Sequence, residues 1–162
     1  MATPQWIRKT LEGRGIPYRE LHHSSAYTAQ EVAQREHVSG HAVAKVVVVM
    51  ADGKPVELVL PASRRVELER VRQILGSADA RMASETEMER YFTDCEVGAV
   101  PPLPHWENIP VLMDSTLRAA DEIVFQAGTH EDAVRLRFSD WYEIVNPRVD
   151  TFTEPIDVAK HR

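Results

Sequence analysis

Residues 46–50 form the strongest apolar block of the chain, with four valines followed by a methionine. The block is too short and too β-branched for a helix, so its composition predicts a buried strand. Asp52 and Gly53 come next and favour the positive backbone angles of a tight turn, and a second apolar block follows at 55–61. The pattern predicts a β-hairpin.

Apolar residues recur at helical spacing in five other segments, most of which carry a start or a stop signal. Two segments open with the spacing of a capping box, Thr28 with Glu31 and Ser84 with Glu87. Ser139 is placed to cap the last segment. The predicted helices cover residues 4–12, 29–39, 66–75, 85–92 and 140–144.

The rest of the chain predicts further strands and one stiff loop. Residues 97–110 contain four prolines and a glycine, which exclude regular structure. The further strands are predicted at 16–23, 111–114, 122–127 and 133–138. After Asn146 the periodic pattern fades. We therefore expect an α/β fold: a single domain over residues 1–146 with a mixed, largely antiparallel central sheet flanked by short helices, and a C-terminal tail at 147–162.

Composition excludes several classes of protein. Of the 162 residues, 43% are hydrophobic and 27% are charged, which is ordinary for a globular domain. The longest apolar run, residues 46–51, is too short to cross a bilayer, and the N-terminus shows no export signal. We expect a cytoplasmic protein without a membrane partner. The formal net charge of −6 weighs against non-specific binding of DNA.

Metal and thiol chemistry have weak support in the sequence. His37 and His41 are four residues apart, but Gly40 between them breaks the helix that this spacing requires. Cys95 is the only cysteine, and as a nucleophile it would need a partner such as His105. A lone cysteine in this setting is more typical of a small core residue. We expect no metal and no other cofactor.

Three features leave two interpretations each. Lys45, directly before the apolar block, either reaches from the strand edge into a cleft toward an anionic ligand or extends into water. The loop at 97–110 either presents free backbone N–H groups to a ligand or only stiffens the surface. Residues 61–72, which carry Arg64 and Arg65, form either a local basic patch or a solvated face of mixed charge.

At these residues the sequence resembles the YbaK/EbsC and prolyl-tRNA synthetase insertion-domain family of trans-editing aminoacyl-tRNA deacylases. The resemblance spans about residues 20–145. It rests on Lys45 at the strand start, on "VGAVPPLP" with the spacing G-x-x-x-P at Gly98 and Pro102, and on "VLP", "ARMAS", "VLMDSTL" and "EIVFQAG". The order and spacing of these pieces, rather than any single one, carry the resemblance.

The resemblance implies a mixed α/β sheet and a pocket for the 3′ acceptor end of aminoacyl-tRNA. It places Lys45 at the phosphate and ribose of the terminal adenosine, and it makes Gly98 the residue that orients or polarises the ester. These two are the candidate catalytic residues. The candidate substrate-binding residues are Tyr27, Met82, Ala99, Val100, Pro101, Pro102, Leu103, Asp114 and Gly128, and Arg64 and Arg65 are candidates for contact with the tRNA.

The implied function is that of a trans-editing hydrolase. It would remove a small amino acid such as alanine or cysteine from a mischarged tRNA, with tRNA-Pro as a candidate and an aminoacyl-tRNA synthetase as a candidate partner. Backbone groups would polarise the carbonyl for a bound water, without a protein nucleophile. Ala99 stands where the family often has a second glycine, and Pro101 where it often has serine. These departures leave open the alternative, a non-catalytic module that binds a nucleotide-like or aminoacyl ligand or a synthetase.

Overall fold

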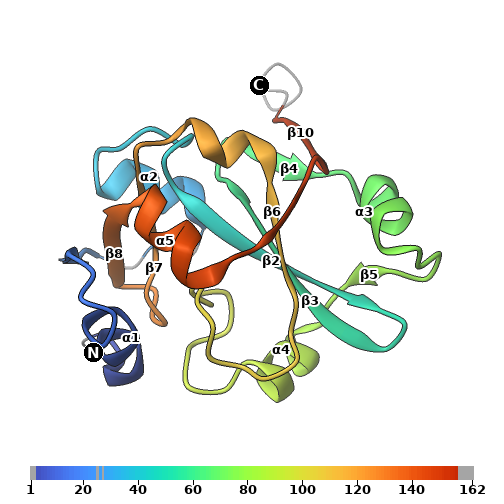
Figure 1. The fold of residues 1–162 in the computed structure, drawn as a ribbon, viewed down its shortest axis with the longest axis horizontal. Helices are drawn as coiled ribbons and strands as arrows, with labels where there is room; N and C mark the ends of the chain where they lie inside the picture. The colour runs from blue at the N-terminus through green and yellow to red at the C-terminus, as the bar shows by residue number, and fades with distance from the viewer. Residues whose placement is uncertain (1–2, 25, 27, 157–162) are drawn as a thin grey trace.

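The computed structural model describes residues 3–24, 26 and 28–156 (Figure 1). All of its helices are short. They are α1 (Gln5–Glu12), α2 (Ala29–Arg35), α3 (Leu68–Leu75), α4 (Glu85–Tyr91), the 3-10 helix η1 (Ser115–Ala119) and α5 (Phe138–Val145). None of the helices in the described ranges has the length and apolar character that crossing a membrane requires.

The strands fall into three sheets. The strands are β1 (Tyr18–His22), β2 (Ala44–Ala51), β3 (Lys54–Pro61), β4 (Arg64–Val66), β5 (Arg81–Met82), β6 (Val111–Asp114), β7 (Glu122–Gln126), β8 (Asp132–Arg137), β9 (Arg148–Asp150) and β10 (Thr153–Pro155). The largest sheet has the order β5-β2-β3-β6-β9. Its first three strands are antiparallel, whereas β6 and β9 are parallel to their neighbours, so the predicted mixed sheet is confirmed.

The hairpin of β2 and β3 forms as predicted. Asp52 and Gly53 take φ angles of 52° and 76°, both in the left-handed region that a two-residue turn of this kind needs. The register pairs Lys45 with Leu60 and Val48 with Glu57. Because side chains alternate between the faces of a strand, Lys45 and Glu57 belong to opposite faces of the hairpin.

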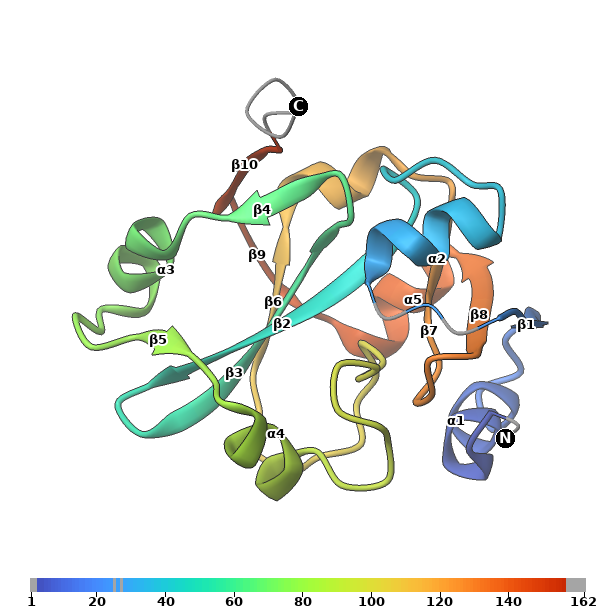
Figure 2. The same ribbon diagram turned by 180° about the vertical axis from the view of Figure 1, so that it is seen from behind.

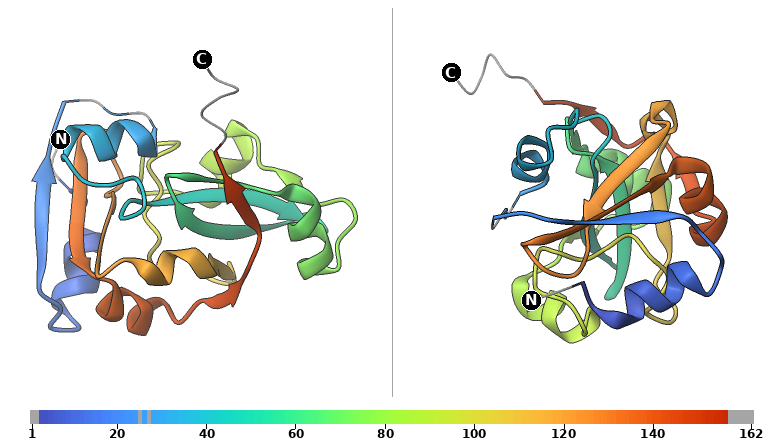
Figure 3. Two further views of the ribbon diagram at one scale, coloured as in Figure 1. Left: turned by 90° about the horizontal axis from the view of Figure 1, so that it is seen from above. Right: turned by 90° about the vertical axis from the view of Figure 1, so that its left-hand side faces the viewer.

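A second sheet closes one end of the molecule. It has the order β1-β8-β7 and is antiparallel throughout, and β7 and β8 correspond to the strands predicted at 122–127 and 133–138. Figure 3 shows this sheet at one end, with β2 and β3 extending away from it. A bridge between Val43 and Val124 joins the two sheets, and the Val124 N–H donates to the Ala42 carbonyl at 2.9 Å. The junction places the start of β2 beside the end of the second sheet.

The main core lies between the sheets, α1 and α5. Trp141 and Phe125 are its largest fully buried side chains. The Trp141 indole N–H donates to the Pro102 carbonyl at 2.8 Å, so the buried ring is bonded to the proline-rich loop as well as packed. The buried Trp141 therefore fixes the position of this loop relative to the core.

Three predicted helix boundaries are wrong. The second helix ends at Arg35, not near Gly40, because His37 takes a φ of 55° and the Val38 N–H donates to the Ala33 carbonyl, which closes the helix end. Val66 belongs to β4 and not to the following helix. Ser139 lies inside the first turn of α5, whose cap residue is Arg137.

The segment after Asn146 is also not the predicted tail, at least as far as Pro155. Residues of β9 extend the main sheet beside β6, and β10 pairs with β4. Between them Phe152 is fully buried against the outer face of β3. Three-residue strands are too short to show a period, which is why the sequence does not reveal them.

Glu57 gives a prediction about stability. Its side chain is buried on β3, one carboxyl oxygen has no hydrogen-bond partner in the described part of the chain, and burial raises its pKa from 4.5 to about 8. The folded protein therefore favours the protonated acid, and stability falls as pH rises from about 4.5 to about 8. We expect Glu57→Gln to melt at a higher temperature than the parent at pH 8, by the equivalent of a few kcal/mol at about 1.4 kcal/mol per pKa unit.

The difference should shrink toward pH 5, where the parent carboxyl is protonated in the folded state. Glu143→Gln on the exposed face of α5 is the matched control and should show no such trend. Thermal melts of the three proteins from pH 5 to pH 8 measure the effect, and a constant difference across this range would contradict it.

Candidate functional site

A pocket of about 220 Å³ lies where the start of β2, the end of β7, α2 and the proline-rich loop meet. Figure 2 shows α2 beside the start of β2, with the loop that follows α4 below them. The pocket brings Lys45 and Gly98 together, although 53 positions separate them in the sequence. The lining residues are Thr28, Ala29, Gln30, Val43, Ala44, Lys45, Val46, Gly98, Val100 and Gln126.

Lys45 is half-buried in this wall, at the second position of β2. Burial lowers the pKa of its ammonium from the ordinary value of 10.5, and no acidic group offsets the effect. Within the described ranges the side chain forms no ion pair. A partly buried cation without a counter-ion attracts an anionic ligand, because the ligand restores the interaction that burial removed.

The loop that carries Gly98 is hydrogen-bonded to the turn after β7. The Glu96 N–H donates to the Gly128 carbonyl at 2.7 Å, and the Gly128 N–H donates to the Ala99 carbonyl at 3.0 Å. His130 adds a third bond, from its Nε2 to the Val97 carbonyl at 2.9 Å. Because a carbonyl only accepts, this nitrogen carries the proton. The bonds clamp the backbone on both sides of Gly98.

Gly98 itself has a φ of 85°, in the region that favours glycine. A Cβ built there would lie 3.4 Å from Cε1 of His130. Among the described residues, the backbone N–H groups of Gly98 and Val100 have no acceptor, and both residues line the pocket. Two free N–H groups on a rigid loop can polarise a carbonyl without rearranging when the substrate binds.

Three polar side chains on the pocket wall are missing from the sequence-based site. Gln126 donates from Nε2 to the Ala26 carbonyl at 2.7 Å, and Gln30 donates to the Ala62 carbonyl at 2.9 Å, so both amides are held in place. Thr28 is recognisable in the sequence only as a helix cap. Gln126 did leave a signal, because it is a polar residue directly after the three apolar residues of "EIVFQ".

Several predicted substrate residues lie in the core instead of on the pocket wall. Leu103 and Ala99 are fully buried, and Pro101 and Pro102 are buried beside them. Leu103 packs in the main core cluster, so it shapes the loop from behind. Of the predicted loop residues, Gly98 and Val100 reach the pocket surface.

The remaining predicted residues are spread over the molecule. Met82 lies on the edge strand β5 with 51% of its surface exposed, and it is not part of the pocket wall. Tyr27 lies outside the described residues. Arg64 donates to the Thr153 hydroxyl at 2.6 Å, and Arg65 pairs with Glu154 at 2.5 Å. Both arginines therefore hold β10 against β4.

Asp114 and Gly128 have structural explanations. Asp114 is fully buried: its Oδ1 accepts the Phe152 N–H at 2.9 Å, and its Oδ2 accepts the N–H and the hydroxyl of Thr116. Gly128 has a φ of 84°, and a Cβ there would lie 2.8 Å from Cγ of Pro4. These two residues connect the site to β9 and to α1 and do not line the pocket.

The described residues contain no group of three or more side chains arranged to hold a metal ion. Cys95 lies outside the pocket lining, and burial together with neighbouring carboxylates raises its pKa to about 12. A thiol with a raised pKa is a poor nucleophile at neutral pH, because the thiolate is the reactive form.

The fold and the pocket place the chain in a known class of protein. A model of the aminoacyl-tRNA editing domain matches residues 23–144, three quarters of the chain, and the chain belongs to this family. The resemblance in the sequence is thereby confirmed, together with the assignment to aminoacyl-tRNA deacylases.

Individual relatives agree with this class. The chain is 26% identical over 155 residues to the multifunctional Ser/Thr-tRNA deacylase ProXp-y of Escherichia coli, which covers 93% of this chain and 92% of that protein. It is 27% identical over 125 residues to the proline–tRNA ligase of Leuconostoc citreum, covering 77% of this chain and 21% of the ligase. A crystal structure assigned as a candidate trans-editing enzyme for prolyl-tRNA synthetase has the same fold, with a TM-score of 0.80 at 23% identity over 93% of this chain and 96% of that one.

Gly98 gives a prediction that separates site geometry from stability. We expect Gly98→Ala to lower kcat/KM for aminoacyl-tRNA deacylation on the order of 100-fold. Alanine disfavours the positive φ of this residue and its Cβ would contact His130, so the backbone would shift and the direction of the Gly98 N–H would change. The stability cost should be about 1–2 kcal/mol.

Gly15→Ala is the matched control, since Gly15 has a φ of 66° with no atom near its virtual Cβ. It should lose similar stability and keep the parental activity. Equal activity of the two variants in a deacylation assay would show that the Gly98 backbone does not act in the reaction.

Proposed function

We propose that the protein is a trans-editing hydrolase that removes a small amino acid from the 3′ end of a mischarged tRNA. The observation that carries the proposal is the pocket that combines the half-buried Lys45 with the N–H groups of Gly98 and Val100. Within the part of the chain that the structure describes, Lys45 has no ion-pair partner and the two N–H groups have no acceptor. An aminoacyl-tRNA offers the matching chemistry, namely a phosphate and ribose next to an ester carbonyl. Membership of the editing-domain family supports the same substrate class.

The reaction needs little from the protein beyond positioning. The Gly98 and Val100 N–H groups would bind the ester carbonyl oxygen and stabilise the negative charge that develops there. A water oxygen attacks the carbonyl carbon, the bond to the ribose oxygen breaks, and that oxygen leaves with a proton. The neighbouring ribose hydroxyl would relay this proton, because an already activated ester held beside a water reacts without a protein nucleophile.

Lys45 would act on the nucleotide side of the ester. Its ammonium would contact the phosphate and ribose of the terminal adenosine, which fixes the position of the ester relative to the loop. The lowered pKa supports this role, because it reflects burial of the ammonium with no carboxylate partner among the described residues.

The size and polarity of the pocket favour a small, hydroxyl-bearing amino acid. A volume of about 220 Å³ is below the roughly 300–1,000 Å³ of sites that enclose drug-sized ligands, so it suits an aminoacyl group and not a whole nucleotide end. Alanine or cysteine is the amino acid expected from the sequence. Thr28, Gln30 and Gln126 make part of the pocket wall polar, so we place serine and threonine first and keep alanine and cysteine as alternatives. The E. coli relative is named for activity on Ser- and Thr-tRNA.

A second candidate function is a binding module without turnover. It is favoured by one observation: among the residues that the structure describes, the pocket lining contains no carboxylate, histidine or cysteine that would activate a water. Such a module would bind charged tRNA, or a prolyl-tRNA synthetase that carries it, without releasing the amino acid. Multiple-turnover release of amino acid separates the two functions directly.

Lys45 provides the main test of the mechanism. We expect Lys45→Ala to fold as the parent does and to lose about 10- to 150-fold in kcat/KM, the equivalent of one charged contact of about 1.5–3 kcal/mol. Lys45→Arg, which keeps the charge, should restore part of the activity.

The pH dependence gives a second test of Lys45. Because burial lowers the pKa of the Lys45 ammonium, the parent should lose enzymatic activity at a lower alkaline pH than Lys45→Arg does. The rate of spontaneous ester hydrolysis is subtracted at each pH. Parental rates in Lys45→Ala would refute the assigned role.

The substrate range tests the pocket separately. Initial rates at equal concentration and fixed salt for seryl-, threonyl-, alanyl-, cysteinyl-, prolyl- and phenylalanyl-tRNA should place the two hydroxyl-bearing substrates first and phenylalanyl-tRNA last. Serine and alanine should differ by less than about 200-fold, because a small pocket discriminates similar side chains weakly. Gln126→Leu should reduce the preference for serine over alanine. Fastest release of phenylalanine would contradict the small pocket while leaving the deacylase class in place.

A further inference from the structure

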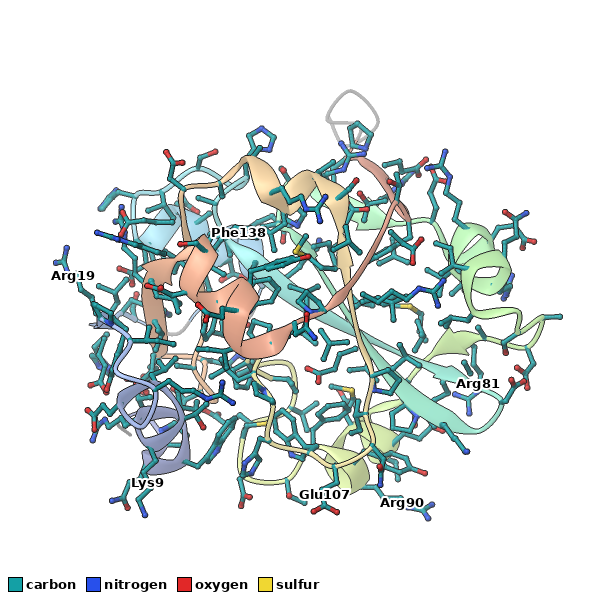
Figure 4. The ribbon with its side chains drawn as sticks, in the orientation of Figure 1. Lys9, Arg19, Arg81, Arg90, Glu107 and Phe138 are labelled. Carbon is teal, nitrogen blue, oxygen red and sulfur yellow. The ribbon has the colours of Figure 1, made fainter. Side chains whose placement is uncertain are left out.

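A second and larger cavity lies on the far side of the proline-rich loop. This groove, of about 650 Å³, is bounded by the tip of the β2–β3 hairpin, the end of α4 and residues 105–109. Its chemically distinctive lining residues are Lys54, Arg90, Tyr91, His105, Trp106 and Glu107. Arg90 and Glu107 mark this edge of the molecule in Figure 4.

The two cations of the groove, Lys54 and Arg90, form no ion pair with a described residue, although the carboxylate of Glu107 also lines the groove. Many arginines elsewhere in the described ranges pair with a carboxylate, as Arg81 does with Glu87 at 2.7 Å. Lys54 and Arg90 form no such pair among the described residues, and both are exposed. The guanidinium of Arg90 lies over the ring of Tyr91, 5.2 Å from its centre. In a protein with a net charge of −6, unpaired cations of this kind set where a polyanion can approach.

Two aromatic rings of the groove, those of His105 and Trp106, are held in fixed positions. The Trp106 indole N–H donates to the Thr93 carbonyl at 3.1 Å, and its ring packs edge-on against Phe92 at 4.9 Å. His105 stacks on Trp6 at 3.9 Å and its Nε2 bonds Asp94. Rigid aromatic faces beside free cations are the combination that binds single-stranded nucleic acid, since bases stack on the rings and phosphates contact the cations.

We propose that this groove binds the unpaired strand or the end of the acceptor stem of the tRNA, adjacent to the nucleotide held at Lys45. The inference rests on the proposed function for the identity of the nucleic acid. One loop connects the two sites, with Gly98 in the first pocket and Trp106 in the groove. Eight residues of extended chain span at most about 28 Å, which corresponds to about eight stacked nucleotides at 3.4 Å each. The groove is therefore within reach of the strand whose aminoacyl group would enter the smaller pocket.

Binding of uncharged tRNA tests the groove without relying on catalysis. Fluorescence anisotropy with a labelled tRNA transcript, and with a short single strand of its 3′ end, would be measured over a series of salt concentrations. We expect the double variant Lys54→Ala/Arg90→Ala to bind the transcript about tenfold more weakly. The slope of the logarithm of the binding constant against the logarithm of the salt concentration should become less steep by roughly 0.7–0.9 for each phosphate contact removed. Tyr91→Leu, which keeps an apolar side chain but no stacking face, should weaken binding about fivefold or more with an unchanged salt slope.

Lys9→Ala/Arg19→Ala is the matched control. These two cations are also exposed and unpaired in the described structure, and Figure 4 shows them on α1 and β1, away from the groove. The control should bind within twofold of the parent. The proposal would be overturned if the groove variants and the control bound tRNA equally well. That result is also the one expected if the groove binds a protein partner. A parent protein that binds no tRNA would overturn the proposal too.

Failure of the groove proposal can be distinguished from failure of the deacylase proposal. If the protein binds tRNA through the groove but releases no amino acid, the proposed function fails while the groove stands. If the double variant hydrolyses charged tRNA with the parental KM and binds uncharged tRNA as the parent does, the groove fails while the function stands. Thermal melts of each variant confirm that the fold is intact.

Discussion

The site depends on the set of backbone hydrogen bonds that joins residues 96–99 to the turn after β7. Glu96, Ala99 and Gly128 exchange two backbone bonds, and His130 adds a third to Val97. These bonds use the polar groups on both sides of Gly98 and leave its own N–H without an acceptor. A loop with this many prolines has few N–H groups to offer, so the few that remain free can be aimed at a ligand. The rest of the structure keeps the two segments close enough for these bonds to form.

Contacts of three other residues keep the loop at residues 96–99 close to the turn after β7. Trp141 on α5 bonds the Pro102 carbonyl from the core, Pro4 before α1 packs against the bare backbone of Gly128, and Trp6 on α1 donates to the Asp94 carbonyl at 3.0 Å. The N-terminal helix, which is outside the matched family segment, thus contributes to holding the loop. Asp114 has a comparable role farther away, because its carboxylate ties the end of β6 to the buried Phe152. Polar residues that the sequence suggests as ligands for a substrate instead keep the backbone in place.

Which residues act in the reaction stays a prediction, and the structure adds side chains that other elements contribute to the same pocket. Lys45, Gly98 and Val100 meet in one pocket, as the resemblance implied. The other predicted residues have different contacts. Leu103 packs in the core, Asp114 accepts the Phe152 N–H, and Gly128 lies against Pro4. Gln126 and Gln30 join the site because β7 and α2 pack beside β2, and no local pattern records that packing.

Local preferences in the sequence determined the strands of four or more residues, most helices and the β2–β3 hairpin, because apolar periodicity, capping boxes and turn residues act over a few positions. They also determined that residues 97–110 would be irregular and stiff. Only the tertiary structure decided that residues 148–155 complete two sheets, since strands of three residues gain their stability from the partners they meet. It also decided that Arg64 and Arg65 bind the C-terminal strand, and that Lys45 is left half-buried without a carboxylate. Burial and partner choice depend on contacts between distant segments, and these contacts set the charge and the shape of the site.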